Sequence, residues 1–507
     1  MKPVVLSHVL FVVAMLMLGL SSCSAEELPQ PLEKGDAFQF AVDAGKVSRP
    51  VNRHIMGISF SNMSGWVPIY DRRTGDWVLK EHAVEAIQDL RVPFSRIYWL
   101  DPGQSGRRAW DLEGAIDRVA ELCRRSGIRQ EDFVVELEQQ AQSRSTSPER
   151  WAEAVRYSQS KGYRFRLWEV CNEPYGVGGP RDDPWTPEQY VAHVKEVYRA
   201  VKAVDPDAQV GMAADLSPWN HFQATQTDNP MLGQLAGYYD FACPHFYCHM
   251  EDVDLVPFEH ITFEADQWVI DAYVRQMRVL LDRYNPGKKI PILDTEWGMH
   301  GYNSADGSAV DANRNCNIAG AVHRAIRMIY YFNEDLLQGA SQWTMLEPAT
   351  ARGWGIVASD DERLFVLYYL NYSFGRYVGD QLLSVSGTCP YYEKSGVEFG
   401  YRSEPRDISM PKVPVLATKS ADGKKLYLIA VNGTADQSLP CHVDLVSFRA
   451  GSAEGKQLSQ SSIDASALVD KETDVMSALP MKVLADGQSI EFESAPHSIS
   501  FIALTAR

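Results

Sequence analysis

Short apolar runs alternate with longer segments of helical period between about residues 54 and 346. Eight of these runs have the length and composition of buried strands, and they begin at Ile55, Phe94, Asp132, Phe165, Ala208, Tyr239, Ile290 and Ala340. Between them, helical spacing predicts helices over 81–90, 112–126, 148–161, 187–204, 231–235, 265–284 and 313–334. Ser147-Pro148 and Thr186-Pro187 mark two helix starts, because each places a capping residue before a proline. The pattern is that of repeated βα units.

Eight strands with crossover helices predict a closed (β/α)8 barrel, the TIM-barrel fold, over residues 51–365. An open, doubly wound parallel sheet is the alternative. No glycine-rich phosphate loop follows the first strand, as a nucleotide-binding sheet of that kind requires. We therefore expect the barrel.

The helical period ends near Leu370, and alternating strands replace it to the end of the chain. Segments such as "KKLYLIAVNG" and "SISFIALTA" have the strand period, and Asp422-Gly423 and Asp486-Gly487 mark turns. We predict a C-terminal antiparallel β-sandwich over 366–507. A strand within 36–50 precedes the barrel, and we expect it to join this sandwich.

The first residues place one lysine before a short apolar stretch, which is typical of an export signal. Leu20 to Cys23 resembles a bacterial lipobox, in which the cysteine becomes the lipid-modified first residue. We predict a signal peptide over 1–22, lipidation at Cys23 and a tether over 23–35. The alternative is an ordinary secretory signal cleaved nearby. The expected product is an exported lipoprotein anchored at the outer membrane or cell surface.

Composition narrows the functional classes. Hydrophobic residues make up 45% and charged residues 23% of the 507, as in soluble globular proteins. The formal net charge of −17 disfavours nucleic acid as a partner, since nucleic-acid binding depends on clustered Lys and Arg. Seven cysteines besides Cys23 fit no disulfide scaffold, so we expect buried thiols. Cys243, His245, Cys248 and His249 are zinc-ligand types, but their spacing matches no common zinc site, and no metal is predicted.

Two acids stand at the ends of predicted strands. The fourth strand finishes in "WEVCNEPYG" with Asn172 and Glu173, and the seventh in "PILDTEWGMHG" with Glu296. Because barrel strands meet at one face with their carboxyl ends, we expect the two acids to face each other across the barrel mouth. Asp294, two residues before Glu296, is expected on the same face but deeper, in a structural role.

Two further acids lie within predicted strands. Glu136 and Glu169 form a rival pair, but an unpaired buried carboxylate is very unfavourable. We therefore expect both inside the barrel, paired with Arg96 or Arg166.

Paired carboxyl groups are what glycosidic bond cleavage requires. One group protonates the leaving oxygen, and the other attacks the anomeric carbon or activates water. A separation of about 5 Å permits a covalent intermediate and retention, whereas a wider gap admits water and gives inversion. The sequence does not fix this distance.

The Asn-Glu pair closing strand four and the Glu closing strand seven resemble the signature of the retaining glycoside hydrolases built on this barrel. "WEVCNEP" and "LDTEWG" are most similar to glycoside hydrolase family 39, and next to family 51. The resemblance implies that Glu173 is the acid/base, that Glu296 is the nucleophile, and that Asn172 binds the sugar 2-hydroxyl. Cys171 departs from these families, where Trp or Gly is commoner before the Asn.

The same resemblance implies a wider sugar site. Arg96 would support the nucleophile carboxylate, His245 and Tyr247 would line the sugar site, and Trp343 would form an aromatic platform. Trp297 is a further candidate, although either tryptophan is equally compatible with packing.

The expected function is therefore a retaining glycoside hydrolase acting on plant or algal oligo- or polysaccharides, β-xylosidase-like in specificity. An α-L-arabinofuranosidase and an endo-acting β-glycanase or agarase-like enzyme are alternatives within the clan. A non-catalytic carbohydrate-binding surface lipoprotein is the alternative of another class. This chemistry needs no metal or organic cofactor, and the sequence does not specify an oligomeric state.

Overall fold

The computed structural model describes residues 32–61, 69–73, 76–97, 100, 111–138, 145–175, 185–216, 228–250, 256–301, 314–349, 354–399 and 405–507. The predicted signal peptide, Cys23 and the first part of the tether lie outside the described residues. Within the described part of the chain, no helix is both long and apolar enough to cross a membrane.

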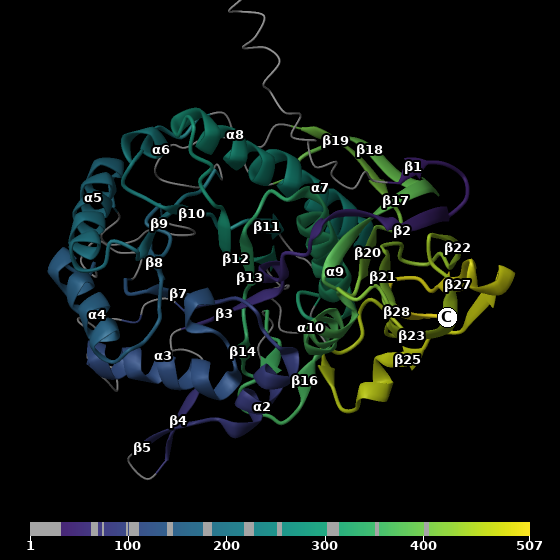
Figure 1. Ribbon diagram of the computed structural model, residues 1–507, viewed down its shortest axis with the longest axis horizontal. Helices are drawn as coiled ribbons and strands as arrows, with labels where there is room; N and C mark the ends of the chain where they lie inside the picture. The colour runs from purple at the N-terminus through teal and green to yellow at the C-terminus, as the bar shows by residue number, and fades with distance from the viewer. Residues whose placement is uncertain are drawn as a thin grey trace, which may run out of the picture.

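Parallel strands form the barrel, which lies on the left in Figure 1. In sheet order they are β10 (Phe241–Cys243), β9 (Gln209–Ala213), β8 (Leu167–Val170), β7 (Phe133–Glu136), β6 (Ser95–Ile97), β3 (Gly57–Phe60), β13 (Gly339–Gln342), β12 (Leu293–Gly301) and β11 (Tyr247–Met250). A bridge between Ala242 and Ile292 joins β10 to the start of β12. The two ends of the sheet therefore meet, and β10 and β11 are successive parts of one interrupted barrel strand. The predicted (β/α)8 barrel is confirmed.

The helices surround the barrel as the periodicity predicted (Figure 1). They are α2 (Glu81–Leu90), α3 (Leu112–Ser126), α4 (Pro148–Ser160), α5 (Pro187–Val204), α6 (Pro230–Gln234), the run of η4 (His260–Glu264), α7 (Ala265–Val269), η5 (Ile270–Val274) and α8 (Arg275–Tyr284), and α9 (Ile318–Glu334). Ser147 caps α4 and Thr186 caps α5 through their side chains, each before a proline. The predicted strand from Ile55 begins instead as a 3₁₀ turn, η1 (Arg53–Met56).

One further helix, α10 (Val366–Tyr377), occupies the start of the segment predicted as β-sandwich. Its residues are almost all buried, so it lacks the amphipathic period that identifies surface helices. After the barrel, the strands of the second domain accordingly begin at Gln381. Both α9 and α10 lie between the barrel and this domain in Figure 1.

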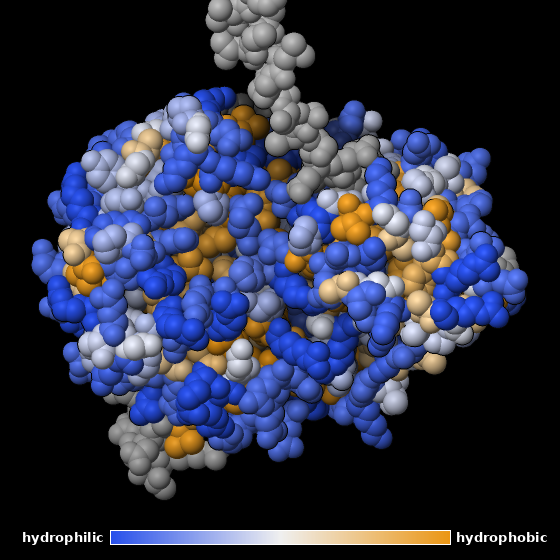
Figure 2. Space-filling view, in the orientation of Figure 1, coloured by the Kyte–Doolittle hydropathy of each residue, from blue (hydrophilic) through white to orange (hydrophobic). Residues whose placement is uncertain are grey.

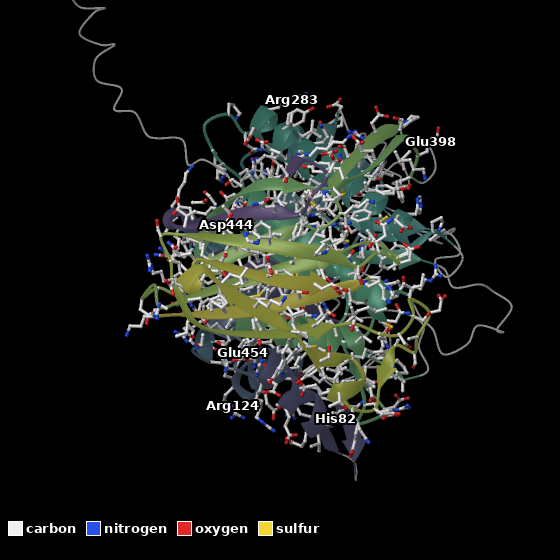
Figure 3. The ribbon with its side chains drawn as sticks, turned by 90° about the vertical axis from the view of Figure 1, so that its right-hand side faces the viewer. His82, Arg124, Arg283, Glu398, Asp444 and Glu454 are labelled. Atoms are coloured by element: carbon white, nitrogen blue, oxygen red, sulfur yellow. The ribbon has the colours of Figure 1, made fainter. Side chains whose placement is uncertain are left out.

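The second domain is one eleven-stranded sheet that encloses its own apolar core. Its path is β25 (Met476–Ala478), β23 (Ala450–Leu458), β28 (Ser498–Ala506), β21 (Lys425–Asn432), β20 (Val415–Lys419), β17 (Gln381–Cys389), β2 (Gln39–Pro50), β22 (Leu439–Val446), β27 (Ser489–Ser494) and β26 (Met481–Leu484), with β1 (Glu33–Lys34) beside β17. Most pairs are antiparallel, and β2 inserts between β17 and β22. Figure 3 faces this domain, with Asp444 on β22 and Glu454 on β23. Both residues of β1 fall within the segment predicted as tether.

Several short elements have no counterpart in the predicted pattern. They are the hairpins β4 (Tyr70–Arg73) with β5 (Asp76–Leu79) and β18 (Tyr391–Val397) with β19 (Arg406–Pro411), and a small sheet of β14 (Leu346–Glu347), β15 (Val357–Ala358), β16 (Leu364–Phe365) and β24 (Leu468–Val469). In that sheet β24, from the C-terminal part of the chain, pairs with β16 beside the barrel.

The barrel interior changes from apolar to charged along the strands. Phe94, Val134, Phe241, Cys243 and Leu293 form an apolar layer of their own, against which Leu167 packs. Two residues further along their strands lie the fully buried Arg96, Glu136 and Glu169. Side chains two apart share one face of a strand, so the charged layer lies toward the carboxyl end, where barrel sites are found. Figure 2 shows hydrophobic residues within the ring of helices on one face of the molecule.

Candidate active site

The chain turns sharply where β8 ends. Cys171 and Glu173 both have positive φ angles, of 67° and 46°, in the left-handed region that residues other than glycine rarely occupy. The side chains of Asn172 and Glu173, which follow directly on the strand, are almost completely buried. Such backbone outliers persist where the surrounding structure fixes them, and they occur often at functional sites.

A β-bulge in β12 directs Glu296 into the barrel. Asp294 pairs with Ala340 and Trp297 with Gln342, so that Thr295 and Glu296 together oppose a single residue of β13. Leu293 faces the interior layer, whereas Asp294 accepts hydrogen bonds from Phe246 N at 3.2 Å and from the hydroxyl of Tyr331, on α9, at 2.9 Å. The expectation that Asp294 lies on the face of Glu296 is therefore wrong, because the bulge interrupts the alternation of side chains. Its hydrogen bonds do give it a structural role.

Arg96 is the centre of the buried charge cluster. Its guanidinium donates from Nε and Nη2 to the two oxygens of Glu169 at 3.1 and 3.0 Å, from Nη1 to Glu296 Oε2 at 2.8 Å, and from Nη2 to Asn172 Oδ1 at 2.7 Å. Burial opposes charge on Glu169, but the Arg96 guanidinium overcomes it and lowers the pKa of that carboxyl. The Arg96 side chain thus connects the carboxyl ends of three strands, its own β6, β8 and β12. Arg166, the other predicted partner, instead pairs with Asp205 at 3.1 Å.

His245 lies in the interruption between β10 and β11, and Tyr247 is the first residue of β11. His245 Nδ1 lies 3.0 Å from Glu173 Oε1 and 3.8 Å from Glu296 Oε2, while Nε2 lies 3.7 Å from Glu169 Oε1. Burial alone lowers the pKa of His245, but the Glu296, Glu169 and Glu173 carboxylates raise it to about 10. The surrounding carboxylates therefore favour the protonated form of His245. Tyr247 donates its hydroxyl proton to Glu296 Oε1 at 2.8 Å.

Glu173 and Glu296 face each other across this cluster. An oxygen of each carboxyl group and a nitrogen of His245 lie within 4.8 Å of one another. Burial raises the pKa of Glu296, as does Glu173, whereas His245 and Arg96 lower it. Both Glu296 oxygens accept hydrogen bonds, Oε2 from Arg96 and Oε1 from Tyr247. The net effect raises the pKa of Glu296, while Arg96 and Tyr247 bond to its two oxygens.

Among the described residues, the side chains of Glu173, His245 and Glu296 are close enough together to hold a metal ion. Cys243 and Cys248 do not belong to this group. Cys243 lies in the interior apolar layer, and Cys248 lies near Arg327 and Asp266. The side chain of His249 lies outside the described residues.

The two tryptophans lie in different surroundings. Trp297 is fully buried, with its ring 5.6 Å from that of Tyr331 on α9, so it does not join the cluster around Glu296. Trp343, which follows β13, is also buried, and its backbone N–H donates to Trp297 O at 2.9 Å. Its carbonyl accepts from Arg324 of α9 at 2.9 Å. This buried arginine was not among the predicted residues, since arginine on a predicted helix normally indicates a solvent-facing position.

No protein-family model matches the sequence. No curated protein sequence matches it either. Solved structures do resemble the fold. The family 51 α-L-arabinofuranosidase from Thermotoga petrophila has a TM-score of 0.72 at 17% identity, and the one from Xanthomonas axonopodis pv. citri 0.68 at 14%, each over 92% of this chain and all of that chain. A family 44 xyloglucanase from Paenibacillus polymyxa has a TM-score of 0.60 at 12% identity, over 93% of this chain and all of its own. At these identities the likeness establishes a shared fold of barrel and β-sandwich.

Proposed function

We propose that this protein is a retaining glycoside hydrolase with Glu173 as acid/base and Glu296 as nucleophile. The carrying observation is that one oxygen of Glu173 and one oxygen of Glu296 lie within 4.8 Å of each other at the carboxyl end of the barrel. Retaining enzymes hold their acids about 5–5.5 Å apart, whereas inverting enzymes need roughly 6.5–9.5 Å to admit water. Solved structures with a similar overall fold are glycoside hydrolases, which supports the proposal.

In the first step, a Glu296 oxygen bonds to the anomeric carbon while the glycosidic C–O bond breaks. Glu173 gives its proton to the leaving oxygen. In the second step, Glu173 takes a proton from water, the water oxygen bonds to the anomeric carbon, and the bond to Glu296 breaks. Arg96 and Tyr247 hold Glu296 as an acceptor-only carboxylate, ready to attack.

His245 has a separate part in this scheme. It lies 3.0 Å from Glu173 Oε1, so that oxygen accepts from the imidazolium and Oε2 is the atom that carries the catalytic proton. When Glu296 becomes glycosylated, its negative charge disappears. Glu173 then ionises more readily and serves as base. In this proposal Asn172, fixed by Arg96, binds the substrate hydroxyl next to the scissile bond.

The substrate is proposed as a plant or algal oligo- or polysaccharide with a terminal pentose. The sequence motifs favour a β-xylosidase-like specificity. The fold likeness to family 51 arabinofuranosidases favours an α-L-arabinofuranosidase. Both remove a pentose, so the two differ in ring form and linkage.

One screen tests the reaction and the specificity together. Purified protein is incubated with aryl glycosides of xylose, arabinofuranose, galactose and glucuronic acid, and the first-formed product anomer is followed by NMR. We expect hydrolysis of a pentoside with retained configuration. Inversion would contradict the nucleophilic role of Glu296. Sugar binding without product across the panel would favour the non-catalytic carbohydrate-binding protein.

For the N-terminal segment we propose export and lipid anchoring through Cys23. The basis is the resemblance of the sequence to a lipobox. Expressed in a Gram-negative host with a clickable palmitate analogue, the wild type should be labelled and membrane-associated. A Cys23→Ala variant should be neither. Equal labelling of the two would contradict the proposal.

A further inference from the structure

We propose that Arg324 is a positioning residue of the active site, which fixes the Trp343 backbone and places a positive charge behind Tyr247 and the nucleophile. This inference rests on the proposed hydrolase function. It concerns a residue of α9, outside the barrel strands that carry the two acids.

Arg324 fixes the end of β13. Its Nη2 donates to Trp343 O at 2.9 Å, and Nη1 donates to Gln342 Oε1 at 3.2 Å. Gln342 in turn donates to Asn371 of α10 at 2.8 Å. Because the Trp343 N–H is already bonded to Trp297 O, both backbone polar groups of Trp343 are held. The position of Trp343 therefore depends directly on the Arg324 guanidinium.

Burial of this cation is unusually unfavourable. Arg324 is fully buried, and within the described part of the chain it forms no ion pair with a carboxylate. Burial lowers its pKa to about 10. Arg327, three residues later and also fully buried, has Asp266 at 2.5 Å as its counter-ion. A buried charge without such a partner destabilises the fold, which points to a role other than stabilising it.

Gly298 lies between Arg324 and Tyr247. A Cβ added at Gly298 would lie 3.3 Å from Arg324 Nη2 and 3.7 Å from Tyr247 Cε1, so the glycine leaves the two side chains in close proximity. The guanidinium acts electrostatically on the Tyr247 phenol, which donates to Glu296 Oε1. A positive charge at this place favours the ionised nucleophile.

Several groups set the titration of Glu296. They are His245 and Tyr247 from the interrupted strand, Glu173 after β8 and Arg96 from β6. Arg324 from α9 acts on Tyr247, and Glu347 of β14 acts on Arg324. Arg324 is the one in this set that also holds Trp343. Its two effects are separable, because lysine keeps the charge but lacks the two-point geometry of the guanidinium.

The test compares Arg324→Lys and Arg324→Met with the wild type on its best aryl pentoside, with kcat and KM measured across pH. Arg324→Lys should raise KM about tenfold while the acid limb of the kcat/KM profile stays in place. Arg324→Met should raise KM and also move that acid limb to higher pH, because the nucleophile then ionises less readily.

Arg49→Met is the matched control, with melting temperature recorded for every variant. Arg49 of β2 is a buried arginine that contacts the C-terminal end of α9, paired with Asp335 at 2.5 Å and bonded to Phe332 O. Its loss should lower the melting temperature and leave KM and the pH profile unchanged. If Arg324→Met does not fold, the KM of Arg324→Lys decides.

Folded Arg324 variants with wild-type KM and pH profile would overturn this inference alone. A wild type that hydrolyses none of the glycosides would overturn both the inference and the proposed function.

Discussion

The mouth of the barrel and the interior of the β-sandwich are both buried, but they are built from opposite kinds of residue. The sandwich core consists of side chains such as Phe40, Leu428 and Ile502. The barrel mouth instead buries Arg96 and Glu169 completely, with a bulge and left-handed residues beside them. Apolar burial stabilises a fold, whereas buried charges cost free energy unless they are paired. The difference assigns stability to one region and chemistry to the other.

The strongest test of this difference between the two regions replaces one atom at the barrel mouth. Glu296→Gln keeps the volume of the side chain and removes the attacking oxygen. We expect kcat to fall by roughly 10⁴-fold or more, with a melting temperature close to that of the wild type. Single-turnover kinetics and thermal unfolding measure the two quantities. Activity within tenfold of the wild type would contradict the assignment.

Removing the central cation should affect both stability and activity. Arg96→Met leaves Glu169 and Glu296 without their partner, so we expect a loss of about 3–5 kcal/mol in unfolding free energy together with loss of turnover. Urea unfolding and initial rates measure the two effects. A variant as stable as the wild type would show that the cluster is not held by Arg96.

The sandwich should show the reverse behaviour. Ile502→Ala removes a fully buried side chain and should lower the unfolding free energy by about 2–5 kcal/mol. Because Ile502 lies outside the barrel, kcat/KM measured well below the melting temperature should stay within about twofold of the wild type. A large loss of activity in folded Ile502→Ala protein would contradict the claim that the sandwich contributes to stability and not to catalysis.

The charge cluster also predicts a pH dependence of stability. The pKa of His245 rises from 6.5 to about 10 in the folded protein. Its protonation therefore stabilises the fold fully below pH 6.5, and this contribution is lost as pH rises through about 10. The difference in unfolding free energy between the wild type and His245→Gln should be constant from pH 5 to about 6.5 and should shrink above it. A difference that grows with pH would contradict a buried imidazolium.

Much of the fold was predictable because its signals are local. Each strand run, each helix period and each of the caps at Ser147 and Thr186 involves residues that are close neighbours in the sequence. The features of the fold that the sequence analysis did not predict depend on residues far away in the sequence. The β12 bulge is set by pairing with β13, and α10 is buried between two domains, so neither shows in a local period.

The candidate site divides in the same way. Glu173 and Glu296 were found because strand ends of a barrel converge, and the structure brings Arg96, Asn172, His245 and Tyr247 to them. Trp297 points elsewhere because it follows the bulge on the side facing α9. Arg324 was missed because its role depends on a helix whose face toward the site only the three-dimensional structure reveals.

The most direct test of the central claim is to trap the covalent intermediate. A 2-deoxy-2-fluoro analogue of the best substrate, with a good leaving group, is incubated with the wild type, since fluorine slows release of the glycosyl-enzyme by destabilising the positively charged transition state. Peptide mass spectrometry then locates the label. We predict one added glycosyl group, on Glu296. A label on another residue, or stoichiometric leaving-group release with no label at all, would contradict the proposed mechanism.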